Sequence, residues 1–109
     1  IAVALVILWS SFGLLKESVG MSLMGVPEGI LVEEVEAELA ELDGVETVHD
    51  LHIWPLSTTE TALTAHLVVP TIDSDALIEA ARRMLHDRFG IEHCTLQIER
   101  THLEDADCC

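Results

Sequence analysis

The stretch VETVHDLHIWPLSTTETALTAHLVVP, residues 45–70, decides the fold. It holds two runs rich in valine, isoleucine, leucine and threonine, at residues 45–56 and 61–69. A proline closes each run, and four polar residues at 57–60 separate them. β-Branched residues bounded by turn residues and proline are typical of strands. The stretch therefore predicts two consecutive strands joined by a polar turn.

Apolar residues recur at helical spacing on both sides of these strands. Before them the pattern runs from Leu31 to Leu42 and stops at Gly44. After them a second pattern begins at a cap on Asp73 or Ser74 and ends at Gly90, and residues 91–100 form a third strand. The order αββαβ predicts an α+β open sandwich with two helices on one sheet face, resembling a ferredoxin-like, metallochaperone-like fold that lacks its first strand. A core this thin favours pairing with a second copy.

The N-terminal run IAVALVILWSSFGLL, residues 1–15, carries no charge and is apolar on every face. A complete membrane span needs roughly 20 apolar residues, so we expect residues 1–17 to be the C-terminal part of a transmembrane helix. A buried core helix is the alternative. Glycine and proline in residues 18–29 predict a linker. Residues 30–101 then form the domain, and residues 102–109 form a polar tail.

Charge is distributed as unevenly as hydrophobicity. The net charge is −15, and residues 28–46 carry eight acidic groups with no basic one. An acidic surface with only five basic residues in the chain disfavours nucleic-acid binding and attracts cations. The alternative is that the acidic residues only keep a small domain soluble. The sequence holds no nucleophile elbow, phosphate loop or dinucleotide fingerprint, so we do not expect an enzyme. Three cysteines do not suggest a disulfide framework and fit a reducing compartment.

Strand alternation predicts which side chains share a sheet face. Leu63, Ala65, Leu67 and Val69 should face the helices, which places His66 on the open face. By the same rule Cys94 faces the core, and the open face receives His93, Gln97 and Glu99. In the first strand, alternation puts His49, Leu51 and Ile53 on one face and Asp50, His52 and Trp54 on the other, without saying which set faces the helices.

Imidazole and carboxylate groups on neighbouring strands are zinc ligands when they converge. His66, His93 and Glu99 share a face by alternation, and His49 joins them if it lies on the open side. The alternative is that these histidines are ordinary surface or core residues. His52 and Trp54 are predicted to pack, and His86 to act as a cation at a helix C-terminus. Cys108 and Cys109 offer thiolates, although adjacent cysteines form a poorer clamp than C-x2-C, and a disordered tail is the alternative.

Several motifs, in order, resemble those of the cation diffusion facilitator family, in its zinc-transporting branch. They are ILWSSFGLLKES followed by GVPEGI, then VHDLHIWPLS, ALTAHLVV and FGIEHCTLQIE. The resemblance covers nearly the whole chain. It identifies the start of the chain as the end of the sixth transmembrane helix, and the rest as the C-terminal cytoplasmic domain.

The resemblance implies a multi-pass membrane homodimer that exchanges zinc, or another divalent metal ion, for protons. It implies that residues 27–109 are cytoplasmic and that their domain binds metal, stabilises the dimer and so regulates transport. It assigns His49, His66 and Glu99 as ligands, with His49 on the open face, and places His93 near a further ligand position. Cys108 matches the first cysteine of a C-x2-C motif. Two other hypotheses remain: a membrane-tethered dimerisation module without metal, and a soluble metallochaperone-like domain.

Overall fold

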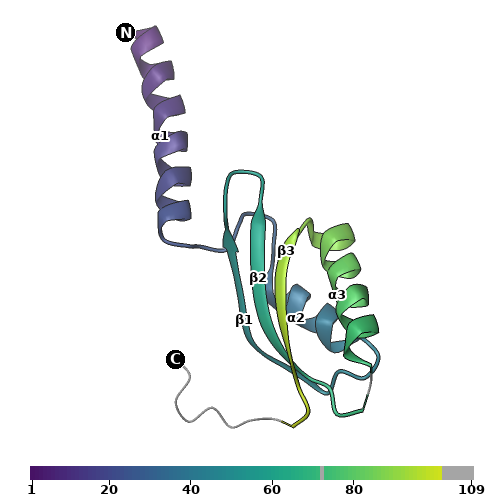
Figure 1. Cartoon of the computed structure of the whole chain (residues 1–109). Coiled ribbons are helices and arrows are strands. Elements are labelled where there is room, and N and C mark those ends of the chain that lie inside the picture. Colours follow the sequence, from purple (N-terminus) through teal and green to yellow (C-terminus); the bar gives the residue numbers. More distant parts are fainter. Residues whose placement is uncertain (72, 102–109) are drawn as a thin grey trace.

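The computed structural model describes residues 1–71 and 73–101, and Figure 1 shows their arrangement. A long N-terminal helix precedes an αββαβ domain with a three-stranded sheet of order β1-β2-β3. β1 and β2 pair antiparallel as a hairpin, and β2 and β3 pair parallel, with a helix as the crossover. The elements are α1 (Ala2–Ser22), α2 (Val32–Ala40), β1 (Thr47–Pro55), β2 (Thr61–Val68), α3 (Ser74–Phe89) and β3 (His93–Glu99).

Both domain helices pack on one face of the sheet, as the sequence predicts. The buried core joins Val35 and Leu39 of α2 to the inward residues of α3 and of the strands. The inward residues that alternation predicts for β2 and the residue after it are all buried: Leu63, Ala65, Leu67 and Val69. Among the described residues, no helix covers the other sheet face (Figure 1). Side chains on that open face are therefore not packed against the domain helices and can contact a ligand or a partner.

The ends of α3 follow from the residues at its caps. The Asp73 side chain accepts a hydrogen bond from the Asp75 backbone N–H at 3.1 Å, which satisfies one of the unpaired donors of the first turn. Gly90 ends the helix with φ +65°, a left-handed conformation that glycine adopts without the steric penalty of a Cβ atom. β3 begins three residues after this cap, and Glu99 is the last residue of that strand.

α1 stands apart from the sandwich, and no residue of it is buried. Within the described residues it is the one helix long and apolar enough to cross a membrane. It runs past Glu17, where the sequence predicted its end, to Ser22. Gly20 is tolerated because a single glycine weakens a helix without breaking it. The helix stops where Met24 adopts φ +51°, next to Gly25.

Candidate metal centre

β1 is not a regular strand, and its irregularity shapes the site. The register pairs His49 with His66 and then His52 with Thr64, so Asp50 and Leu51 together oppose the single residue Ala65. This is a β-bulge, and Asp50 lies in it with φ +49°. A bulge adds one residue to one strand and thereby reverses the alternation beyond it. Aspartate is among the few residues that adopt this left-handed conformation readily.

The bulge corrects the face assignment made from alternation. Val48 packs against the core before the bulge, and Leu51 and Ile53 do so after it. His49 therefore does not share a face with Leu51 and Ile53, as strict alternation required. It lies on the open face opposite His66, which is where the family resemblance placed it.

Three of the predicted ligands converge on the open face. His49 Nε2 lies 3.1 Å from Glu99 Oε2, and His66 Nδ1 lies 3.1 Å from Glu99 Oε1. The two imidazole rings stand edge to face with centroids 5.1 Å apart. One nitrogen or oxygen atom from each of the three residues lies within 4.8 Å of the other two. The antiparallel register supplies the two histidines, and β3 supplies the carboxylate between them.

Glu99 is the most enclosed member of this cluster, with 6% of its surface exposed. Burial acts to raise the pKa of its carboxyl group. A 2.8 Å hydrogen bond from Gln97 Nε2, the bond from His49 and the charges of both histidines outweigh burial, so the pKa lies below its usual value. The carboxylate is therefore ionised at neutral pH, as a metal ligand must be. Gln97, which alternation placed on the same face, orients the carboxylate through its hydrogen bond.

Asp50 is the residue of the site that sequence reasoning missed. Its Oδ2 lies 3.5 Å from His49 Nδ1 and 3.6 Å from His66 Nδ1. Alternation had assigned Asp50 to the face opposite His49, and only the bulge brings both side chains to the same side. An Asp inside a strand-like run is a weak sign of a bulge, because aspartate disfavours regular strands.

The nitrogen of His66 that faces the cluster has no partner for a conventional hydrogen bond. Nδ1 is buried, and among the described residues it makes none, although it lies close to Glu99 Oε1. Leaving a buried polar atom without a hydrogen bond costs about 1–3 kcal/mol. Zinc lies about 2.0–2.2 Å from nitrogen and oxygen ligands, which puts neighbouring ligands roughly 3.3 Å apart in a tetrahedral shell. The donor set fits a zinc ion, and the two nitrogen–oxygen distances of 3.1 Å are close to that ligand spacing.

The structure does not bring His93 to this cluster. Alternation predicts the face of a residue but not its position along the strand. His93 pairs with Ala62 at the start of β3, six residues before Glu99, or about 20 Å at the usual rise per residue. It lies instead 3.5 Å from Glu60, in an exposed group with Glu60 and Glu92.

The remaining predicted residues lie outside the centre. His86 is exposed and lies 3.1 Å from Asp87 Oδ1, which agrees with a surface role near the end of α3. Cys94 packs against the core, and burial raises the pKa of its thiol. Cys108 and Cys109 fall outside the described residues.

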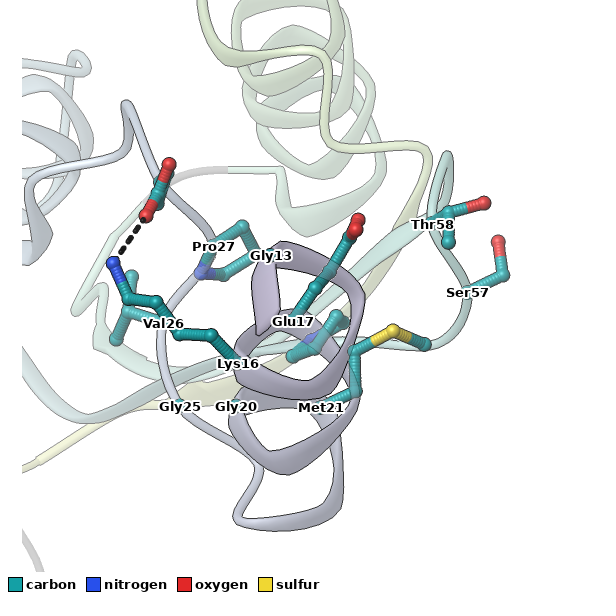
Figure 2. Close-up of a pocket in the computed structure, with 12 residues that line it drawn as sticks. Gly13, Lys16, Glu17, Gly20, Met21, Gly25, Val26, Pro27, Ser57 and Thr58 are labelled. Atoms are coloured by element: carbon teal, nitrogen blue, oxygen red, sulfur yellow. Dashed lines mark ion pairs between the residues drawn. The ribbon is translucent and has the colours of Figure 1, made fainter. Parts of the chain in front are cut away.

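A pocket of about 590 Å³ lies between the C-terminal half of α1, the linker and the β1–β2 turn. Neither His49 nor His66 lines it. Figure 2 shows Lys16 and Glu17 of α1, Pro27 of the linker and Ser57 and Thr58 of the turn around it. Lys16 Nζ lies 3.7 Å from Glu28 Oε1. None of the three clustered residues lines this pocket, so it is separate from the candidate metal centre.

Comparison with known proteins identifies the domain. A family model described as the cytoplasmic domain of cation efflux proteins matches residues 27–101, which is most of the chain. The chain belongs to the cation efflux family. The model begins at Pro27, after α1, and ends after β3, so the matched region is the αββαβ domain.

Curated relatives align with almost the whole chain. It is 40% identical over 103 residues to a probable zinc transporter of Dictyostelium discoideum, covering 94% of this chain and 19% of that protein. It is 36% identical over 109 residues to the cation efflux system protein CzcD of Alcaligenes sp. strain CT14, covering 98% and 34%. It is 34% identical over 110 residues to the zinc transporter ZitB of Escherichia coli, covering 99% and 35%. The chain thus spans about a fifth to a third of these relatives.

Two solved structures share the fold. The metal-bound C-terminal domain of the CzcD transporter from Cupriavidus metallidurans is 36% identical, with a TM-score of 0.59, over 64% of this chain and 99% of that one. The zinc form of CzrB is 23% identical, with a TM-score of 0.58, over 77% and 97%. The ferredoxin-like fold predicted from the element order is therefore confirmed.

Proposed function

We propose that this chain is the C-terminal part of a proton-coupled exporter of divalent metal ions, with zinc as its principal substrate. In this proposal α1 is the end of a membrane-spanning helix, and residues 27–109 lie in the cytoplasm. The domain binds zinc at His49, His66 and Glu99, and metal binding stabilises a homodimer and so tunes transport. The relatives named above, which are zinc transporters and cation efflux proteins, support the substrate class.

The observation that carries the proposal is the cluster of two imidazoles and a buried carboxylate on the open face of the sheet. The cluster presents the buried His66 Nδ1, which makes no hydrogen bond in the described part of the chain, and an ionised carboxylate. Two neutral imidazoles and one carboxylate would carry one negative charge and attract a divalent cation. Three protein ligands leave one position of a tetrahedral zinc shell for water or a further ligand.

Cys108 and Cys109 are proposed as further metal ligands, Cys108 on the family resemblance and Cys109 on the chemistry of its thiol. Cys108 and Cys109 carry thiols, which bind zinc strongly once they are deprotonated. A tail ligand could fill the fourth position of the shell. Replacing both cysteines with serine tests this role, since zinc affinity should fall if either thiolate binds the ion.

Calorimetric zinc titration of the chain in detergent tests the proposed site. Substitutions His49→Ala, His66→Ala and Glu99→Ala each remove one ligand and should weaken binding at least about 100-fold, the upper end of the cost of losing an outer-shell partner. His86→Ala is the matched control, because it removes an exposed imidazole and should bind as the wild type does. Equal affinity across all five proteins would refute the metal site and favour a dimerisation module that does not use metal.

A further inference from the structure

We infer that Asp50 is a positioning residue for this site, and that its carboxylate keeps the proton of the His49 ring on Nδ1. His49 Nε2 is then left with its lone pair directed at the metal ion. The inference rests on the metal binding proposed above and assigns a role to a residue outside the three ligands.

The two nitrogens of His49 face different carboxylates. Nε2 lies 3.1 Å from Glu99 Oε2, inside the cluster, and Nδ1 lies 3.5 Å from Asp50 Oδ2. A neutral imidazole carries one proton, and a nearby anion favours the tautomer with the proton on the closer nitrogen. The Glu99 carboxylate is the competing anion in the absence of metal. With a cation bound in the cluster, Nε2 would carry no proton, and Asp50 would stabilise the proton on Nδ1.

A metal-binding histidine usually donates its second ring nitrogen to a carboxylate or carbonyl group, and Asp50 Oδ2, 3.5 Å from His49 Nδ1, lies where such a carboxylate would act. The two acidic side chains, Asp50 and Glu99, also differ in how deeply they are buried. The Asp50 side chain is 35% exposed, whereas the Glu99 side chain is 4% exposed. The enclosed carboxylate is therefore the ligand, and the more exposed one acts on the far side of the ring.

The bulge in β1 makes this contact possible. In a regular strand, consecutive side chains point to opposite faces, and Asp50 would point away from the ring of His49. With φ +49° at Asp50, its carboxylate instead approaches the rings of both His49 and His66. The Asp50 carboxylate is also 3.6 Å from His66 Nδ1, so it adds negative potential where a cation would bind.

Two substitutions separate the backbone role of Asp50 from the role of its carboxylate. Asp50→Gly favours the left-handed conformation and so preserves the bulge, while it removes the carboxylate. Asp50→Asn keeps the side-chain shape and an acceptor oxygen but removes the charge. Glu46→Gln, on the exposed approach to β1, is the control for loss of one negative charge.

Zinc titration in detergent should show Asp50→Gly about 10- to 100-fold weaker than the wild type, with Asp50→Asn in between and Glu46→Gln unchanged. The cobalt(II) absorption spectrum of Asp50→Gly should keep the wild-type band shape, because no ligand is lost. In the zinc-bound wild type, nitrogen NMR of the His49 ring should show a protonated Nδ1 and a metal-bound Nε2.

Wild-type affinity in Asp50→Gly would overturn the inference, since Asp50 would then serve only the bulge. A changed cobalt spectrum would also overturn it, because Asp50 would be a direct ligand. If Asp50→Gly does not fold, wild-type affinity in Asp50→Asn together with a metal-bound Nδ1 on His49 overturns it. Failure of the wild type to bind zinc refutes the proposed function itself, which these other outcomes do not.

Discussion

Glu99 is the residue on which both histidines of the site converge. One oxygen of its carboxylate faces His49 and the other faces His66, both at 3.1 Å. The hydrogen bond from Gln97 holds the carboxylate in that orientation. A buried, oriented and ionised carboxylate is a ligand prepared before the metal arrives, which lowers the cost of ordering the site on binding.

The response of the site to acid follows from the chemistry of its two kinds of ligand. Free imidazole has a pKa of about 6.5, and zinc binds only the neutral form of imidazole. The pKa of Glu99 is lowered in the fold, so its carboxylate stabilises the folded protein above its usual pKa, and this contribution is lost only as pH falls through the lowered value. Protonation of Glu99 therefore sets in only at lower pH than protonation of an ordinary glutamate.

We predict that zinc affinity is nearly constant above pH 7.5 and falls steeply below about pH 6, approaching tenfold per pH unit for each imidazole that must lose a proton. Calorimetric titrations at three pH values, in buffers of different ionisation enthalpy, would measure both the affinity and the protons released. Affinity that stays constant down to pH 5 would show that the histidines are not ligands.

At the scale of the element, β1 and β2 differ in how well alternation predicts which side chains face the helices. Alternation correctly placed the inward residues of β2 and the open-face position of His66, because β2 is regular throughout. It failed in β1, because one added residue at the bulge reverses every later assignment. The family resemblance placed His49 correctly, since it compares motifs and does not depend on counting positions along a strand.

Element ends were harder to predict than element identities. The caps of α3 were read from Asp73 and Gly90, whose side-chain and backbone properties act locally. The end of α1 was not, because the charges at Lys16 and Glu17 end an apolar run without ending a helix. The position of His93 along its strand was also not predicted, and the structure places it with Glu60 and Glu92.

At the scale of the whole molecule, the domain builds its core without α1. The core contains residues of α2, α3 and the sheet, and no buried residue comes from α1. One face of the sheet is covered by helices and the other is open. A small domain with one uncovered sheet face gains stability when a second copy buries part of that face.

We therefore predict that residues 27–109 form a soluble dimer without α1. Circular dichroism should show a folded α+β protein in buffer, and sedimentation at micromolar concentration should give twice the monomer mass. Zinc should strengthen the association if metal binding and dimerisation are coupled. A monomer both with and without zinc would count against the dimer.

Within residues 1–71 and 73–101, two groups of candidate metal ligands lie at different places in the domain. One is the enclosed group of His49, His66 and Glu99, and the other is the exposed group of Glu60, Glu92 and His93. Water screens the charges of the exposed group and leaves its side chains mobile, so a cation gains less binding free energy at that group. We expect zinc to occupy the enclosed group first.

Anomalous diffraction at the zinc edge, from crystals of the zinc-loaded chain, tests this claim most directly. We predict a strong peak about 2.0–2.2 Å from His49 Nε2, His66 Nδ1 and a Glu99 carboxylate oxygen. A peak confined to the group of Glu60, Glu92 and His93, or no peak at either group, would contradict the account.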